Sequence, residues 1–242
     1  MIYRTHAELY DRIYHWKDYE GESRKLRALL THEGIEEGSA VLEAACGTGL
    51  FLEQLQDRYE MSGFDIHEPM LELARRRVPS VPLFAADMRR FALDSPVDAL
   101  LCLFSSIGYL RSDKELSEAA ACFARALRPG GLLVVEPWIL REHYEPGRPS
   151  MHTYADENLK LCRAVVAEID GDRAVMEMNW LVAARDQPIR HLAERHEMRF
   201  TPIESMLAIL EETGFHARFE EEGLMEGRGL YIARRAATRV TP

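Results

Sequence analysis

Long apolar runs, signal-peptide features and an excess of positive charge are all missing from this 242-residue chain. No segment approaches the roughly 20 consecutive apolar residues that a membrane-spanning helix needs, so we expect no membrane partner. The N-terminal segment Met1–His6 lacks the charged-then-apolar layout of a signal peptide. A cytoplasmic location is therefore expected.

Cysteine is scarce, and its four positions form no recognisable framework. Cys46, Cys102, Cys122 and Cys162 contain no Cys-x-x-Cys pair, and no cysteine–histidine spacing suggests zinc. We predict no metal site and interpret each cysteine as a buried, reduced thiol.

The net charge is −10, from 30 basic and 40 acidic residues. A protein that binds the phosphate backbone of a nucleic acid usually presents a basic face. We therefore expect a small-molecule substrate and no nucleic acid, while a local cationic pocket for a small phosphate stays open.

Short apolar runs alternate with helical patterns from residue 40 onward. The predicted strands are 40–42, 60–65, 81–85, 97–104, 132–135, 217–221 and 230–233. The predicted helices are 50–58, 69–77, 114–127 and 201–213, the last capped by Thr201. This alternation predicts an α/β fold with parallel strands, helices on both faces and a closing antiparallel hairpin.

Two regions depart from that rhythm. Residues 1–38 predict a helical cap, with apolar side chains at helical spacing in 7–14 and 23–31. Residues 139–156 are interpreted as a loop, and 158–169, 173–183 and 191–200 as antiparallel strands. We expect one domain over 1–242, in which 139–200 is an insertion that lines the substrate site or forms a homodimer through exposed edges such as 158–183.

A small-residue loop, Glu43-Ala44-Ala45-Cys46-Gly47-Thr48-Gly49, lies between the first predicted strand and its helix. Small residues let the backbone approach a ligand closely, but two glycines alone are weak support for a binding site. Asp65 and Asp87 strengthen it, because they end the next two predicted strands and carboxyl ends of parallel strands bind ligands in open α/β sheets.

The loop differs from two common phosphate-binding motifs. A Gly-x-Gly-x-x-Gly fingerprint would need glycine at Leu52, and no Gly-Lys-Ser/Thr is present. These differences predict a nucleoside cofactor without a pyrophosphate.

The segments 42–49, Gly63-Phe64-Asp65, Ala86-Asp87-Met88 and Leu127-Arg128-Pro129-Gly130-Gly131 resemble the ordered motifs of class I S-adenosylmethionine (SAM) methyltransferases, over roughly residues 35–137. The resemblance implies a Rossmann-like fold with a seven-stranded, mostly parallel sheet and an antiparallel β insertion. It also implies that SAM is the cofactor and S-adenosylhomocysteine the product.

In this family the first acid lies near the methionine ammonium, the second holds the ribose hydroxyls, and the third contacts the adenine together with the residue that follows it. The implied cofactor-binding residues are Glu43, Ala45, Gly47, Gly49, Asp65, Ile66, Asp87, Met88 and Leu103. Ala45 departs from the commonest pattern, which has glycine there.

A narrower resemblance covers most of the chain. The segments 6–19, 87–91, 104–110, 134–138 and 227–230 are similar to the nucleotide-linked amino-sugar N,N-dimethyltransferases, which make antibiotic sugars such as desosamine. By this resemblance Tyr14, Ser106, Glu136 and Trp138 line the sugar site and Arg228 reaches the phosphates. The implied catalytic residues are Tyr14, Ser106, Tyr109 and Glu136.

Amine methylation requires an unprotonated nitrogen aligned with the methyl carbon, and alignment alone supplies much of the rate. Some members of the amino-sugar group carry histidine where this chain has Tyr109, and tyrosine is a poor proton acceptor with an ordinary pKa of about 10. His15, His143 or His152 are candidates to replace it. Two alternatives remain: an oxygen or nitrogen acceptor on an unrelated small molecule, and a non-catalytic SAM-binding module.

Overall fold

The computed structural model describes residues 6–237. Met1–Thr5, on which the prediction about export depends, lie outside the described residues. Within residues 6–237, no helix combines the length and the apolar character that crossing a bilayer demands.

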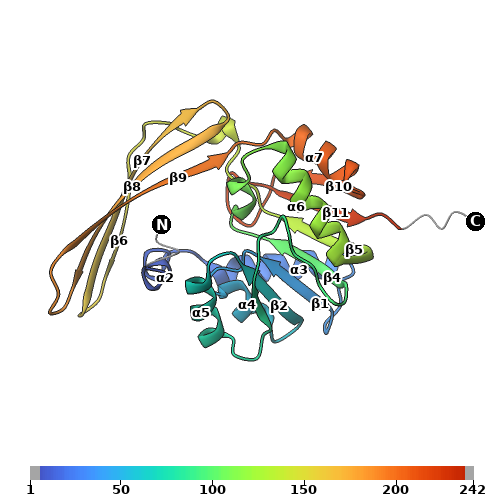
Figure 1. Cartoon of the computed structure of the whole chain (residues 1–242), viewed down its shortest axis with the longest axis horizontal. Helices are drawn as coiled ribbons and strands as arrows, with labels where there is room; N and C mark the ends of the chain where they lie inside the picture. Colours follow the sequence, from blue (N-terminus) through green and yellow to red (C-terminus); the bar gives the residue numbers. More distant parts are fainter. Residues whose placement is uncertain (1–5, 238–242) are drawn as a thin grey trace, which may run out of the picture.

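A seven-stranded sheet forms the centre of the molecule (Figure 1). In spatial order its strands are β10 (Phe215–Glu220), β11 (Leu230–Arg235), β5 (Leu127–Val135), β4 (Val97–Cys102), β1 (Ala40–Ala44), β2 (Glu60–Asp65) and β3 (Leu83–Ala85). The strands from β5 to β3 are parallel, whereas β11 pairs antiparallel with both β5 and β10. The predicted mostly parallel sheet with a closing antiparallel hairpin is confirmed.

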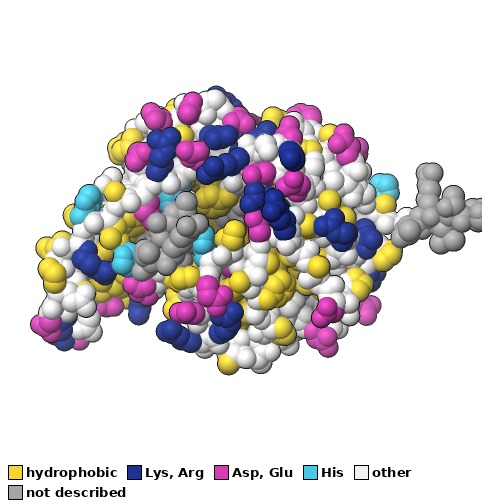
Figure 2. Space-filling view, viewed as in Figure 1, with side chains coloured by type: hydrophobic (Ala, Val, Ile, Leu, Met, Phe, Trp, Pro, Cys, Tyr) yellow, Lys and Arg dark blue, Asp and Glu magenta, His cyan; other side chains and the backbone are white. Residues whose placement is uncertain are grey.

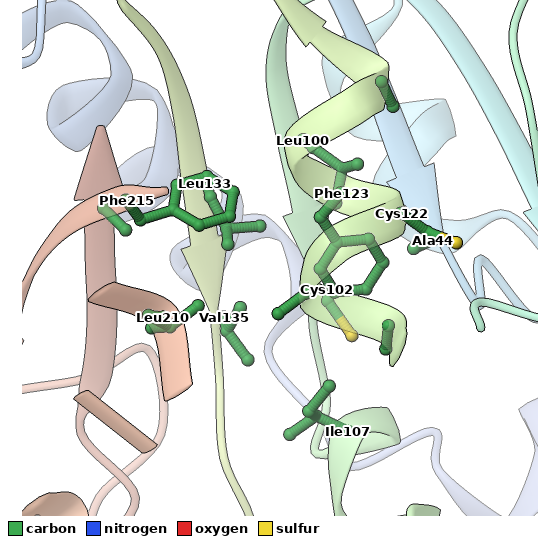
Figure 3. Packing of buried hydrophobic residues seen from close by; sticks show 14 of the residues in the cluster. Ala44, Leu100, Cys102, Ile107, Cys122, Phe123, Leu133, Val135, Leu210 and Phe215 are labelled. Atoms are coloured by element: carbon green, nitrogen blue, oxygen red, sulfur yellow. The ribbon is translucent and has the colours of Figure 1, made fainter. Parts of the chain in front are cut away.

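Both faces of this sheet are buried at its centre, which explains why β4 and the second half of β5 are largely apolar. Neighbouring residues of one strand enter opposite cores, as Leu100 and Leu101 of β4 do. One core packs against α6 (Asp113–Ala126) and α7 (Ile203–Glu212), and the other against α3 (Tyr19–His32), α4 (Leu50–Leu55) and α5 (Glu68–Arg77). Figure 3 shows the first core, with Phe123 of α6 beside Cys102 of β4.

A second sheet has four antiparallel strands, β6 (Ser150–Ala155), β7 (Leu159–Asp170), β8 (Arg173–Ala184) and β9 (Arg190–Arg199), in that order. It extends away from the central sheet, and α2 (Glu8–Ile13) lies beneath it (Figure 1). Leu9 and Ile13 of α2 pack with Trp180 and Leu161 of the sheet. The short helices η1 (Ser106–Tyr109) and η2 (Arg141–His143) follow β4 and β5.

Four local predictions are wrong. Residues 150–155, expected within a loop, form β6. The partly buried side chains of this strand include His152 and Tyr154, so its sequence lacks the alternation of apolar and polar residues that predicts a strand. The segment 158–183 is not an edge, because β7 and β8 are the inner strands of their sheet. Thr201 does not cap α7, whose N-cap residue is Pro202, without a side-chain hydrogen bond. Cys162 is a free thiol like the other three but is only partly buried.

Candidate functional site

The loop after β1 turns sharply through three left-handed residues. Ala45, Gly47 and Gly49 have φ values of 55°, 56° and 80°. Glycine adopts this conformation freely, whereas an L-residue such as Ala45 pays a steric cost. A Cβ at Gly49 would lie 3.2 Å from the Cβ of Ala74, so the second glycine is required for packing against α5.

Asp65 fixes the conformation of this loop from the end of β2. Its Oδ2 accepts a hydrogen bond of 2.9 Å from the Gly47 amide, and its Oδ1 accepts one of 2.8 Å from the His67 amide. Burial raises the pKa of Asp65, while these hydrogen bonds oppose that effect.

Glu43, in β1, carries a buried carboxyl group. It is 3% exposed, and its Oε2 atom has no hydrogen-bond partner among the described residues. Burial, with the charge of Asp65 adding to it, raises the pKa of Glu43 well above its ordinary value. A buried carboxylate without a cation is costly, so this position favours a ligand that brings a positive charge.

The third acid is held differently. Asp87 follows β3 and forms an ion pair with Arg89, which also bonds to Glu115 at 2.6 Å. The hydrogen bonds from Arg89 lower the pKa of Asp87. The carboxylate is therefore charged and fixed in direction at the far end of the site.

One cavity of about 680 Å³ runs from these acids to the four-stranded sheet. Of the predicted cofactor residues, those that line it are Glu43, Ala45, Gly47, Asp65, Ile66, Asp87, Met88 and Leu103. Gly49 does not line it and acts through packing instead. Of the predicted acceptor-site residues, those that line it are Tyr14, Ser106, Tyr109, Trp138 and Arg228. The volume is that of a typical small-molecule site.

Glu136 lies behind the cavity wall and not in it. It is fully buried, and its Oε2 accepts a 2.7 Å hydrogen bond from the amide of Phe104. Phe104 and Ser105 have φ values of 50° and 64°, a strained pair that begins the turn into η1. Glu136 thus stabilises the turn that carries Ser106 and Tyr109 into the cavity.

Arg228 completes the same corner. Its Nη1 donates to Ser105 Oγ at 2.8 Å and lies 4.0 Å from Glu136 Oε2. Its guanidinium also lies over the rings of Phe104 and Trp138, at 5.1 and 5.4 Å from their centroids. The flanking Gly227 and Gly229 both have positive φ, which lets the chain present this side chain on a tight turn.

The four-stranded sheet adds residues that the sequence did not indicate. Arg163 of β7 is 6% exposed, donates to Tyr14 Oη at 2.9 Å, and lies 3.3 Å from Nδ1 of His152. Trp16 stacks on His152 with their centroids 5.2 Å apart. Of the three candidate histidines, His152 lines the cavity, whereas His15 and His143 do not. Arg163 could not be predicted, because a period-two strand pattern does not show which polar residue lines a cavity.

Charge on the surface is mixed. On the face viewed in Figure 2, Lys and Arg side chains are interspersed with Asp and Glu. Within residues 6–237, no three His, Cys, Asp or Glu side chains gather as a metal site would require.

The chain matches a family model described as a methyltransferase domain over residues 41–131. It is 34% identical over 230 residues to dTDP-3-amino-3,4,6-trideoxy-alpha-D-glucopyranose N,N-dimethyltransferase from Streptomyces venezuelae, covering 94% of this chain and 96% of that one. It is 35% identical to dTDP-3-amino-3,6-dideoxy-alpha-D-glucopyranose N,N-dimethyltransferase from Streptomyces fradiae, covering 93% and 89% of the two chains.

Solved structures give the same likeness in three dimensions. The crystal structure of DesVI from Streptomyces venezuelae superposes with a TM-score of 0.88 at 33% identity, covering 96% of this chain and 98% of that one. A SAM-bound amino pentose methyltransferase from Micromonospora echinaspora, involved in calicheamicin biosynthesis, gives a TM-score of 0.81 at 30% identity and covers 91% and 92%.

Proposed function

The chain belongs to the family of SAM-dependent methyltransferases, and from that premise we propose that it methylates the amino nitrogen of a nucleotide-linked deoxyamino sugar. The observation that carries this proposal is the single cavity that joins the three strand-end acids to an aromatic and cationic pocket under the four-stranded sheet. In this proposal the chain acts as one domain, in which α2 and α3 form a helical cap and residues 139–200 form an insertion that lines the substrate site.

The acids suit the parts of the cofactor in their order along the sheet. Glu43, buried with an unpartnered oxygen, would pair with the methionine ammonium, and Asp65 would accept from the ribose hydroxyls. Asp87 and Met88 would contact the adenine. Bound SAM supplies an electrophilic methyl group on a sulfonium.

The acceptor half holds and orients the amine. Tyr14, Ser106 and Trp138 line the space in which a sugar would lie. Arg228 donates one hydrogen bond to Ser105, and its remaining N–H groups would bind the phosphate oxygens of the nucleotide. Glu136 acts by positioning the turn beneath them. Alignment of this kind supplies up to roughly 7–11 kcal/mol of the barrier reduction in favourable cases.

Calorimetry with S-adenosylhomocysteine present would test the assignment, by titrating nucleotide-linked amino sugars into the wild type and Arg228→Ala. We expect the variant to bind the sugar nucleotide about 10- to 100-fold more weakly, as loss of a charge-assisted contact implies, with cofactor affinity intact. Arg148→Ala, an exposed arginine paired with Glu145, is the matched control. Unchanged sugar-nucleotide affinity would remove the phosphate role of Arg228. Failure of the wild type to methylate any such sugar would reject the proposed function.

We also propose a homodimer formed through the outer face of the four-stranded sheet. Met151, Val166 and Leu181 are 66%, 53% and 54% exposed and lie on that face. Sedimentation velocity of the wild type against Leu181→Lys would test it, with a monomeric wild type as the contradicting result.

A further inference from the structure

A hydrogen-bonded chain leads from the cavity into the four-stranded sheet. Tyr109, at the end of η1, lines the cavity, and its hydroxyl lies 2.9 Å from Nδ1 of His196 on β9. Nε2 of His196 lies 3.4 Å from Oε2 of Glu194. His196 is 1% exposed and Glu194 8% exposed, so the chain ends inside the protein.

The two contacts of His196 favour one tautomer. Glu194 offers a carboxylate, which accepts a hydrogen bond, so Nε2 of a neutral His196 carries the proton. Nδ1 is then the acceptor and the hydroxyl of Tyr109 the donor. This arrangement gives Tyr109 a base behind it, which a lone tyrosine lacks.

Two methionine side chains lie beside this chain on the sheet. In the register of β8 and β9, Met176 lies opposite His196 and Met178 opposite Glu194, and both methionines line the cavity. Among the described residues, His196 has two titratable neighbours, Glu194 on the same strand and Tyr109 on η1. Tyr10 on α2 in turn interacts electrostatically with Tyr109. The burial of His196 and Glu194 keeps bulk water from them, so a proton that leaves the cavity here needs a fixed route.

We propose that Tyr109, with His196 and Glu194 acting through it, accepts the proton that the substrate ammonium must lose before each methyl transfer. This inference rests on the proposed function. An N–H bond of the ammonium breaks and its proton passes to the oxygen of Tyr109, while the phenolic proton of Tyr109 passes to Nδ1 of His196. The nitrogen keeps the electron pair, and the imidazolium formed is paired with the carboxylate of Glu194. Methylation yields an ammonium again, so a second transfer repeats the step after the first proton has passed from His196 back through Tyr109 to the cavity and out to solvent.

Tyr109 is the catalytic residue in this scheme, since it faces the substrate, and His196 and Glu194 are positioning residues. Some amino-sugar N,N-dimethyltransferases have histidine at the position of Tyr109. In this chain the imidazole would come instead from His196, 87 positions further along the sequence. His152, one of two histidines that line the cavity, is less suited, because burial and the charge of Arg163 lower its pKa.

The test is the pH dependence of kcat/KM for a nucleotide-linked amino sugar in the wild type, His196→Gln and Tyr109→Phe. At about pH 7.5, where the free substrate is mostly ammonium, we expect both variants to be slower by about 100-fold or more. The deficit should shrink toward about 10-fold or less near pH 9.5, because the amine then arrives unprotonated. His191→Gln, an exposed histidine of the same strand bonded to Asn179, is the control and should match the wild type.

The outcomes separate the two proposals. A loss that is equal at all pH values would show that the variants only disturb packing, and it would overturn the relay, as would unchanged activity in both variants. Tyr109→Phe keeps the inference testable if His196→Gln fails to fold, because it leaves the buried imidazole in place. A wild type that binds S-adenosylhomocysteine but methylates no nucleotide-linked amino sugar would instead reject the proposed function, and the relay with it.

Discussion

If Glu43 binds the cofactor as proposed, it couples the protonation of the protein to cofactor binding. Burial, reinforced by the charge of Asp65, raises its pKa, so the folded protein binds this proton more tightly than the unfolded chain does. The unliganded protein should therefore become more stable as the pH falls through the raised pKa. A bound ammonium would favour the carboxylate, so cofactor affinity should fall over the same range.

The variant Glu43→Gln tests both effects, the one on stability and the one on cofactor affinity. It removes the ionisable group, so the free energy of unfolding of the unliganded protein should lose the pH dependence that Glu43 contributes, measured by urea denaturation at several pH values. Affinity for S-adenosylhomocysteine should fall by about 10- to 100-fold and lose its pH dependence, measured by calorimetry. Glu60→Gln, exposed at the start of β2, is the control. Unchanged affinity would place the ammonium elsewhere.

The three acids Glu43, Asp65 and Asp87 were predictable because each lies at or just beyond the carboxyl end of a strand. Glu43, Asp65 and Asp87 reach one sheet edge whatever the details of packing, since parallel strands end together. The Tyr109–His196 pair and Arg163 were not, because they depend on how a second sheet is placed over the first. For Glu136 the position at the end of a strand was predicted, but the direction of the side chain was not. Its carboxylate accepts a hydrogen bond from the Phe104 backbone instead of lining the cavity.

At the scale of elements, the core strands and helices were largely predictable from apolar periodicity, and β6 was not. β6 is half polar, and pairing with β7 defines it more than its own side chains do. The helix α3 shows what a local signal can add. The Asp18 side chain at its N-cap accepts a 2.8 Å hydrogen bond from the Gly21 amide. The helix predicted from the sequence began later, at Ser23, and so did not include this cap.

Asp18→Ala should remove this cap and lower the free energy of unfolding by about 1 kcal/mol, the usual value for such a change. Urea denaturation measures it. Asp57→Ala is the matched control, because it removes only an exposed ion pair with Arg27 and should cost less than about 0.5 kcal/mol. An equal loss in both variants would mean that the cap contributes nothing of its own.

Across the whole molecule, α2 connects the two sheets and the cofactor loop. Its apolar side packs under the four-stranded sheet through Leu9 and Ile13. Its Asp11 accepts a 2.6 Å hydrogen bond from Thr48 Oγ1 in the glycine-containing loop and forms an ion pair with Arg77 of α5. We therefore expect a change at the loop to be transmitted through α2 to the four-stranded sheet above the cavity.

Asp11→Asn should weaken this connection without changing the size of the side chain. The ion pair with Arg77 is partly exposed, so a modest effect is expected: about a 3- to 10-fold loss of affinity for S-adenosylhomocysteine. Because α2 also supports the roof of the acceptor site, sugar-nucleotide affinity should fall in the same variant. Calorimetry with each ligand measures both, and Glu20→Gln, in an exposed pair with Arg24 on α3, is the control. If cofactor affinity fell alone, α2 would support only the loop, and the two halves of the cavity would bind their ligands independently.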